Sequence, residues 1–245
     1  MPENLDIANY LTDLHLDWQD SRAAFSHNVF LAYYWPVPFF GNPAQAHVAT
    51  VGVNPSSGEF ATHRRWDEVE RLKDWKLRLK HYFTGPVPAH DWFGPWREGL
   101  GLLDVAYETG TATHLDVSYR PTKAMLKNKT TDRREFRHMV ERDVAWLFRL
   151  LPLCPKLRGL LIFGPVVRHD GSTESLAAFV RKSAPRHGFR VVPNGGIACE
   201  VRGQSPREFF LHEVASSGMG TITEQVVANL TTHRDALHRK LHTSG

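Results

Sequence analysis

The chain has 245 residues, of which 42% are hydrophobic and 23% charged, a composition that excludes disordered, collagen-like and coiled-coil proteins. Its 30 Lys and Arg residues outnumber 26 acidic residues, and the resulting charge of +4 permits a polyanionic partner without identifying one. Cys154 and Cys199 are the only cysteines, so we expect neither a disulfide scaffold nor an iron–sulphur cluster, and a cytoplasmic location suits the chain.

The first 45 residues match no motif that points to a function. They lack the basic and then apolar order of a signal peptide. The apolar stretch from Val29 to Phe40 is short and is broken by two prolines, so we do not expect it to span a membrane. No repeat or linker divides the chain, and we expect one domain over 1–245, with an N-terminal helical and aromatic extension (1–45) and a core (46–245).

Short runs rich in branched aliphatic and aromatic residues recur along the chain and predict buried strands. They span His47–Val53, Thr113–Val117, Gly159–Phe163, Phe189–Val192 and Arg207–Val214. The first and third runs lead directly into Asn-Pro and Gly-Pro, as expected where a central strand meets a loop.

Apolar residues at three- or four-residue intervals predict helices between these strands. They run from Trp66 to Leu79, from Phe136 to Leu151, from Leu176 to Val180 and from Val226 to Leu241. The alternation predicts an α/β fold, a three-layer α/β/α sandwich with a mostly parallel central sheet of four or five strands. Ligands of such sheets bind beyond the carboxyl ends of the strands, so the residues that follow each strand are the candidates for a site.

The first predicted strand runs into Gly52–Phe60, which reads GVNPSSGEF. Gly52 permits close approach of the backbone, and the turn at Asn54 and Pro55 can direct an amide side chain and backbone N–H groups into a cleft. An ordinary Asx-Pro turn without a ligand is equally consistent with this segment.

The second predicted strand ends at Asp116, and two basic residues follow it. An acidic side chain within an apolar strand is costly to bury without a partner, so Asp116 is either a binding residue or one member of a cap or ion pair. Arg120 and Lys123 lie just beyond the strand, on the expected cleft side, where they could contact DNA phosphates. Solvated protein surfaces carry the same residue types.

The last predicted strand carries His212 and leads into a loop of small residues before the final helix. His212 could donate a hydrogen bond within a site, although a histidine with a structural role is the more common case. The loop contains Ser217, Gly218 and Met219, and glycines flank the methionine on both sides.

Together these three segments resemble the uracil-DNA glycosylase superfamily, over about Ala46 to Leu237. GVNP (Gly52–Pro55) matches the Asn-containing first motif of its single-strand-selective and mismatch-specific branches. The segment from His212 to Gly220 resembles the second motif, but the usual His-Pro-Ser is replaced by His212-Glu213-Val214. The absence of a cysteine quartet excludes the iron–sulphur branches.

The resemblance implies a monofunctional DNA glycosylase that hydrolyses the bond between a flipped-out pyrimidine and its deoxyribose. The sugar passes through an oxocarbenium-like state while negative charge develops on the departing base. Asn54 would position the attacking water, and His212 would donate a hydrogen bond to the base. Glu59 is a candidate for the carboxylate that activates the water, or alternatively a charge at the start of the following helix. No metal or other cofactor is required, and the chain carries no HExxH motif or paired Cys and His spacing.

The resemblance also implies which residues contact the DNA. Met219 lies where the family inserts an apolar wedge between stacked bases, and Ser217 and Gly218 share that loop. A methionine buried in the core is the alternative. Phe83, within the aromatic-rich stretch from Tyr82 to Trp96, is a candidate ring to stack on the base, although most of these aromatic residues belong to the core.

Asp116 is the position that indicates the substrate. Uracil-specific members of the family commonly place Asn at the matching strand end, where its oxygen accepts from N3–H and its nitrogen donates to O4. An ionised Asp only accepts, so it suits the N4 amino group of cytosine and opposes the O4 atom of uracil. Protonated, it would also donate to N3 of cytosine. Alongside Gly52 and Pro55 in the base pocket, Asp116 therefore favours cytosine over uracil.

We therefore expect the substrate to be a modified cytosine, with a 5-hydroxymethyl or glucosylated group as in phage DNA, which would give the protein an antiviral role. No residue indicates the substituent itself. Three alternatives remain: a repair glycosylase for uracil or another deaminated base, a hydrolase of small molecules, and a DNA-binding module without catalysis. DNA is the expected partner of a monomeric protein that does not contact membranes.

Overall fold

The computed structural model describes residues 6–25, 34–55, 57–61, 66, 69–122, 130–168, 170, 172–201, 203–214 and 222–242. Its strands are β1 (Phe39–Phe40), β2 (Val48–Gly52), β3 (Ala112–Asp116), β4 (Gly159–Phe163), β5 (Pro165–Val167), β6 (Thr173–Ser175), β7 (Phe189–Val191), β8 (Ile197–Cys199) and β9 (Arg207–Val214). Its α-helices are α1 (Ile7–Ser21), α2 (Ser57–Ala61), α3 (Leu72–Lys80), α4 (Gly94–Gly101), α5 (Thr130–Leu150), α6 (Leu176–Ser183) and α7 (Ile222–His242). Short 3-10 helices lie at Arg22–Ala24, Asp91–Phe93, Leu151–Leu153 and Ala184–His187.

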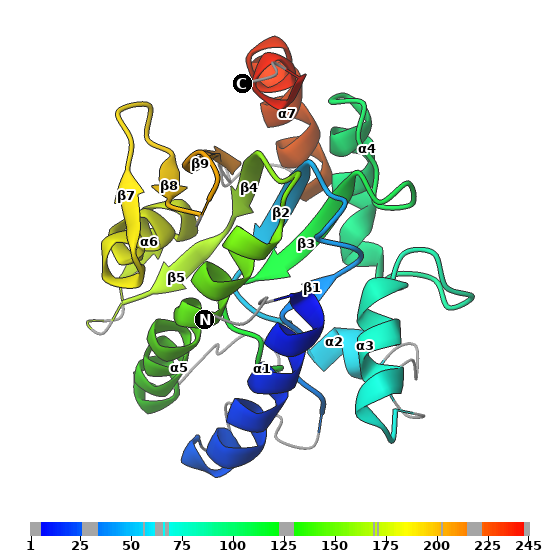
Figure 1. Cartoon of the computed structure of the whole chain (residues 1–245), viewed down its shortest axis with the longest axis vertical. Coiled ribbons are helices and arrows are strands. Elements are labelled where there is room, and N and C mark those ends of the chain that lie inside the picture. Colours follow the sequence, from blue (N-terminus) through cyan, green and yellow to red (C-terminus); the bar gives the residue numbers. More distant parts are fainter. Residues whose placement is uncertain are drawn as a thin grey trace.

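The protein has a mixed α/β fold built on a seven-stranded sheet with the order β1-β3-β2-β4-β9-β8-β7 (Figure 1). The central strands β3, β2, β4 and β9 run parallel, and β1, β8 and β7 extend the two edges in antiparallel pairing. The predicted parallel centre is confirmed, and each of the five predicted strands lies within one residue of its expected limits. The expectation of four or five strands is too low, because the short strands β1 and β8, with two and three residues, were not predicted.

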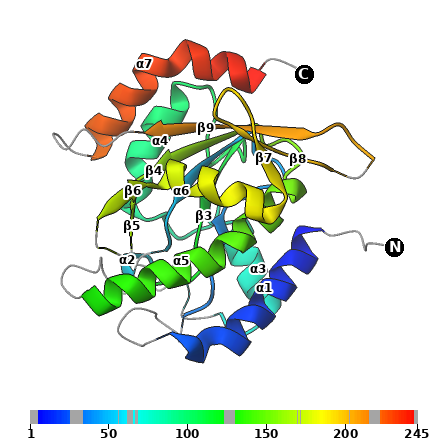
Figure 2. The same ribbon diagram turned by 90° about the vertical axis from the view of Figure 1, so that its left-hand side faces the viewer.

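Helices cover both faces of this sheet. Figure 2 shows α7 and α4 on one side of it and α5 and α6 on the other. As a consequence the central strands are buried on both faces, and Val48, Ala49 and Val51 of β2 have no exposed surface. Gly99 of α4 lies where a Cβ atom would come within 2.6 Å of Leu230 in α7, so this glycine allows the two helices to pack closely.

Three of the four predicted helices correspond to α5, α6 and α7. The remaining one differs: α3 begins at Leu72, and Trp66 and Val69 are buried without belonging to it. Helix α1 packs beside α5 and α3 and contributes Tyr10 and Leu14 to the common core. No helix within the described ranges is long and apolar enough to cross a membrane.

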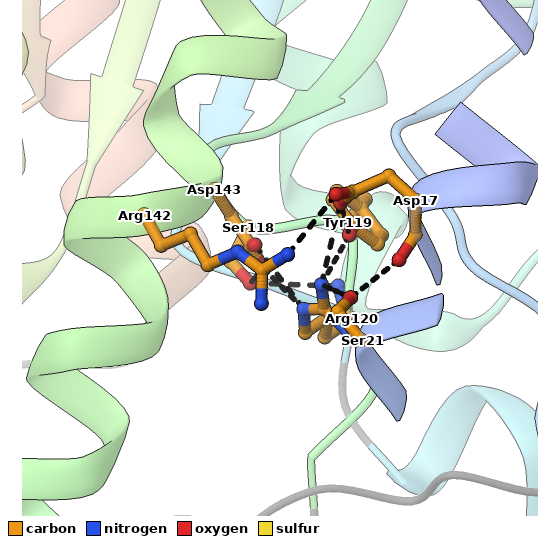
Figure 3. A network of polar contacts seen from close by, with 7 residues as sticks. All are labelled: Asp17, Ser21, Ser118, Tyr119, Arg120, Arg142 and Asp143. Atoms are coloured by element: carbon orange, nitrogen blue, oxygen red, sulfur yellow. Dashed lines mark hydrogen bonds and ion pairs between the residues drawn. The ribbon is translucent and has the colours of Figure 1, made fainter. Parts of the chain in front are cut away.

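A buried ion pair joins the segment after β3 to α5 (Figure 3). Arg120 has no exposed surface, and its Nε lies 3.1 and 3.0 Å from the two carboxylate oxygens of Asp143. The Ser118 hydroxyl donates to the same carboxylate at 2.7 Å. Arg120 Nη2 donates to Ser21 Oγ in α1 at 2.6 Å and to the Tyr119 hydroxyl. The network therefore binds α1, α5 and the chain that leaves β3 to one another.

The rim of this network is closer to solvent. Asp17 of α1 accepts from the Tyr119 hydroxyl at 2.5 Å and from Arg142 at 3.0 Å (Figure 3). The expectation that Arg120 contacts DNA phosphates is wrong, because its guanidinium lies inside the protein and is paired with Asp143. The sequence does not show whether a basic residue near a strand end faces solvent or an internal carboxylate.

We expect Arg120→Met to lower the free energy of unfolding by about 3–5 kcal/mol, because it leaves the Asp143 carboxylate buried without its counter-ion. The double substitution Arg120→Met with Asp143→Leu should recover much of this loss, since both charges are then absent. Urea unfolding followed by circular dichroism measures each change.

Arg190→Met is the matched control for this experiment. Arg190 and Glu208 form an ion pair in which both side chains are 55% exposed, and exposed pairs contribute at most about 1 kcal/mol. A loss for Arg120→Met no larger than the loss for Arg190→Met would contradict the importance of the buried pair.

Candidate functional site

A cavity of about 310 Å³ lies at the carboxyl ends of three central strands. The last residues of β2, β3 and β4, which are Gly52, Asp116 and Phe163, all line it. We call it the strand-end cavity. The remaining lining residues come from neighbouring strands, loops and α2, and they are Phe40, Val53, Asn54, Pro55, Glu59, His90, Trp92, Phe93, His114, Gly164 and Pro165.

A larger hollow of about 510 Å³ lies beside α3, but it is a weaker candidate for a site. Arg71 and His81 in its lining are exposed, and its buried Tyr82 already donates a hydrogen bond to Glu59 in the wall of the strand-end cavity. The strand-end cavity, in contrast, contains the buried carboxyl group of Asp116, one of whose oxygens has no partner in the described part of the chain. Buried polar groups without partners are uncommon in structural positions.

Aromatic rings form much of the wall of the strand-end cavity. Phe40, Trp92 and Phe93 surround the His114 ring, with ring centroids 5.8, 5.0 and 5.2 Å from it. The angles between the ring planes are 26°, 67° and 79°, so the imidazole contacts both a face and edges of its neighbours. Walls of this kind suit a planar ligand that is oriented by a few polar groups.

Asn54 presents a defined chemical group to the strand-end cavity. Its Nδ2 donates to the Pro55 carbonyl at 2.8 Å and to Thr122 Oγ1 at 2.7 Å. Both amide hydrogens are therefore engaged, and Oδ1 is left as the acceptor of the side chain. Thr122 also donates its backbone N–H to the Pro55 carbonyl at 3.2 Å, which holds the turn against the chain that leaves β3.

Glu59 is a second carboxylate in the wall of the cavity. It lies in the first turn of α2 and is only 4% exposed. Oε1 accepts from Trp66 Nε1 at 3.2 Å, and Oε2 accepts from the Tyr82 hydroxyl, which in turn accepts from the backbone N–H of His90 at 3.1 Å. These hydrogen bonds offset part of the cost of burying a charged carboxylate. Its position in the first turn of α2 fits a charge that stabilises the start of the helix, and its place in the cavity fits a carboxylate that acts on a ligand. Both roles stay open for Glu59.

Asp116 is buried at the end of β3 and is incompletely paired. Its Oδ1 lies 3.5 Å from His114 Nε2, and its Oδ2 is buried with no hydrogen-bond partner among the described residues. Burial raises the pKa of Asp116, and the neighbouring His114 partly offsets this rise. A ligand in the cavity that brings an N–H or O–H group would satisfy Oδ2.

His114 is a member of the site that sequence reasoning missed. Its Nδ1 lies 2.9 Å from Thr50 Oγ1, and Thr50 Oγ1 lies 2.5 Å from the Tyr107 hydroxyl. Thr50 and His114 are paired across β2 and β3, as are Gly52 and Asp116. His114 and Asp116 are two positions apart in β3 and so share one face of the sheet, a spacing that could have identified the pair.

Gly52 makes room for this pair of side chains. A Cβ atom at Gly52 would lie 3.2 Å from Asp116 Oδ1 and 3.2 Å from His114 Cε1. We predicted that Gly52 permits a close approach to the backbone. In the structure the groups that approach it are the side chains of Asp116 and His114. Pro55, the other expected base-binding residue of this turn, is buried and lines the cavity.

Two expected site residues lie elsewhere. Phe83 is buried and stacked on Tyr107, with the centroids 4.1 Å apart, and is not among the residues that line the strand-end cavity. His212 of β9 is also absent from the lining. Its Nε2 lies 2.7 Å from Asn229 Oδ1 in α7, its ring packs against His233, and burial lowers its pKa. For His212 the structure favours the structural role.

The expected DNA-contacting residues Lys123, Ser217, Gly218 and Met219 lie outside the described residues. Within the described part of the chain, no group of three or more His, Cys, Asp and Glu side chains is arranged to hold a metal ion. The sequence matches no protein-family model, and comparison with curated proteins finds no match either. The function is therefore argued from the strand-end cavity itself.

We expect Gly52→Ala to disturb the site more than the fold. The added Cβ must displace Asp116 or His114 by a few tenths of an ångström, whereas the backbone of β2 needs no unusual conformation there. Chemical-shift changes in a two-dimensional NMR spectrum should centre on His114 and Asp116. Gly101→Ala is the control, since a Cβ at Gly101 meets nothing within 4 Å. Equal spectral changes in the two variants would contradict this role of Gly52.

We expect Asp116→Asn to stabilise the protein at neutral pH. Burial raises the pKa of Asp116 in the folded protein above its value in the unfolded chain, which is about 3.9. The fold is therefore not penalised while Asp116 is protonated, and it loses stability as pH rises through the folded-state pKa and the buried group ionises. The variant lacks this loss, so its advantage in free energy of unfolding should grow from pH 4 to pH 8. Urea unfolding across that range tests the trend, with exposed Asp20→Asn as the control. A constant difference between variant and parent would contradict it.

Proposed function

We propose that the protein is a monofunctional DNA glycosylase of the uracil-DNA glycosylase type, which hydrolyses the N-glycosidic bond of a flipped-out pyrimidine and leaves an abasic site. The observation that carries this proposal is that Asn54 and Glu59, which follow β2, and Asp116, which ends β3, line one aromatic-walled cavity. The finer fold assignment, a three-layer α/β/α sandwich, belongs to the same proposal and is supported by α4 and α7 on one face of the sheet and α5 and α6 on the other.

In the proposed reaction Asn54 and Glu59 act on the water. Asn54 Oδ1 accepts a hydrogen bond from the water and orients its oxygen toward the anomeric carbon, while the Glu59 carboxylate takes the second proton. The water oxygen bonds to C1′, the bond from C1′ to the base breaks, and its electron pair leaves with the base. His212 has no part in this scheme, because it does not line the cavity.

Asp116 reads the base in this proposal. As a carboxylate it accepts from the N4 amino group of cytosine, and as a carboxylic acid it also donates to N3 when the base departs. Its raised pKa supports the second form. Against the ionised form, uracil would turn its O4 acceptor toward a second acceptor, and such a mismatch in a desolvated site costs about 1–3 kcal/mol. Asp116 therefore supports cytosine as the preferred base.

The size of the cavity permits a substituted base without indicating one. Even at the volume of one water, roughly 30 Å³, for each non-hydrogen atom, the eight atoms of cytosine fill about 240 Å³. The cavity of about 310 Å³ then retains room for the two further atoms of a 5-hydroxymethyl group. A glucosyl group would have to extend out of the cavity. Because such bases occur in phage DNA, an antiviral role follows from the proposal.

A second candidate, a uracil glycosylase, is favoured by one specific observation. His114 lies beside Asp116 in the lining of the same cavity. An imidazole N–H and a carboxylate together offer one donor and one acceptor, which complement O4 and N3–H of uracil. The choice between cytosine and uracil depends on whether the His114 N–H donates its hydrogen bond to Asp116 or to the base.

A panel of oligonucleotides tests the proposed function directly. Duplex and single-stranded substrates carry one uracil, cytosine, 5-hydroxymethylcytosine or glucosylated 5-hydroxymethylcytosine, and alkali cleaves the resulting abasic sites. We expect excision of the modified cytosines, with uracil at least about tenfold slower. Excision of uracil alone would establish the second candidate, and cleavage of none would contradict glycosylase activity.

Asn54→Ala separates an enzyme from a DNA-binding module. Loss of the water-positioning amide should reduce excision by about a hundredfold and leave DNA affinity largely intact. Asn194→Ala, in the exposed turn between β7 and β8, is the matched control and should excise normally. DNA binding that weakens steeply with salt, together with no turnover by the parent protein, would indicate a binding module instead.

A further inference from the structure

We propose that His114 is a positioning residue, held by a one-way chain of hydrogen bonds from Tyr107 through Thr50, and that it orients the Asp116 carboxyl group so that Oδ2 is kept for the ligand. The effect of His114 on catalysis rests on the proposed function. The direction of the hydrogen bonds from Tyr107 through Thr50 to His114 follows from the contacts of the described residues alone.

The chain of hydrogen bonds begins at Tyr107, which is buried. Burial raises the pKa of Tyr107, so its hydroxyl keeps its proton. The hydroxyl lies 2.5 Å from Thr50 Oγ1, which is its hydrogen-bond partner in the described part of the chain. Because a buried hydroxyl proton needs an acceptor, Tyr107 donates and Thr50 accepts.

Thr50 then has one hydrogen of its own to donate. His114 Nδ1 lies 2.9 Å from Thr50 Oγ1, and the Thr113 carbonyl lies 3.5 Å away at the limit of a hydrogen bond. Thr50 therefore donates to His114 Nδ1. In a neutral imidazole that accepts at Nδ1, the proton resides on Nε2.

The proton on Nε2 faces Asp116. His114 Nε2 lies 3.5 Å from Asp116 Oδ1, at the limit of a hydrogen bond, and the ring turns its donor toward this oxygen. Oδ2 is the oxygen that has no partner among the described residues. The two carboxyl oxygens therefore differ in role. Oδ1 is turned toward His114, and Oδ2 is left to accept from or donate to a ligand.

The packing around His114 prevents the ring from turning to reverse these roles. Phe40, Trp92 and Phe93 enclose the imidazole, and Gly52 lies directly beneath its Cε1 and Nε2 atoms. The ring is 3% exposed, so water does not replace Thr50 as its partner. The arrangement engages the His114 proton with Asp116, which favours the base with an amino group over uracil.

Long-range ¹H–¹⁵N NMR of the imidazole groups tests the chain independently of any activity. The His114 signals are assigned by their loss in His114→Gln. We expect the neutral tautomer with the proton on Nε2 in the parent protein. A proton on Nδ1 would reverse the chain and overturn the proposal, whether or not the protein excises a base.

Paired substitutions at Thr50 test the consequence for the site. Thr50→Ser keeps the hydroxyl and loses a methyl group, whereas Thr50→Val keeps the shape and loses the hydroxyl. The ¹³C signal of the Asp116 carboxyl group should move in Thr50→Val and stay in place in Thr50→Ser. On a duplex with one 5-hydroxymethylcytosine, kcat/KM should fall about tenfold in Thr50→Val and recover in Thr50→Ser.

The opposite order of these two variants would overturn the proposal, because a residue that only fills space tolerates Val better than Ser in a buried strand. The two proposals fail separately. If the parent protein excises no base, the glycosylase proposal fails, while the tautomer and the carboxyl signal still decide the role of His114. Normal excision with a reversed tautomer would overturn only the role of His114.

Discussion

The buried ion pair between Arg120 and Asp143 fixes the path of the chain from β3 back to the turn beside β2. That path begins at Asp116, passes Arg120 and reaches Thr122, whose hydroxyl holds the Asn54 amide. The Asp116 carboxyl group lies at the start of this internally anchored segment, and the Asn54 amide is hydrogen-bonded to its other end. Rigid support of this kind is what a site requires for accurate placement of its groups. Stability of the fold and geometry of the site consequently depend on the same charges.

The two buried carboxyl groups of the site are distinguished by their surroundings. Glu59 accepts hydrogen bonds on both oxygens from Trp66 and Tyr82, and hydrogen bonds of this kind stabilise a charged carboxylate. Among the described residues the partner of the Asp116 carboxyl group is His114, and burial raises the pKa of Asp116. In the proposed reaction these different surroundings suit Glu59 as the base and Asp116 as the acid.

The central strands could be predicted because a parallel strand that is buried on both faces needs an unbroken run of apolar residues. Asn54 and Asp116 followed from the same reasoning, since parallel strands bring their carboxyl ends to one edge of a sheet. The partners of polar residues could not be predicted in this way. Arg120 and His212 have the same side chains whether they face DNA or another part of the protein, and only the packed structure decides. The hydrogen bond of His114 to Thr50 could not be predicted because Thr50 lies in another strand, although the two-residue spacing of His114 and Asp116 was open to view in the sequence.

The locked amide of Asn54 has a consequence for how selectivity is distributed. Because both of its hydrogens are engaged before any ligand arrives, the side chain needs no reorganisation and loses little conformational entropy when a reactant binds. In the proposed reaction a water on Asn54 Oδ1 therefore needs no rearrangement of this side chain, whatever base occupies the cavity. Under the same proposal the choice of base falls to Asp116, so the reactivity of the water and the choice of base can change independently of each other.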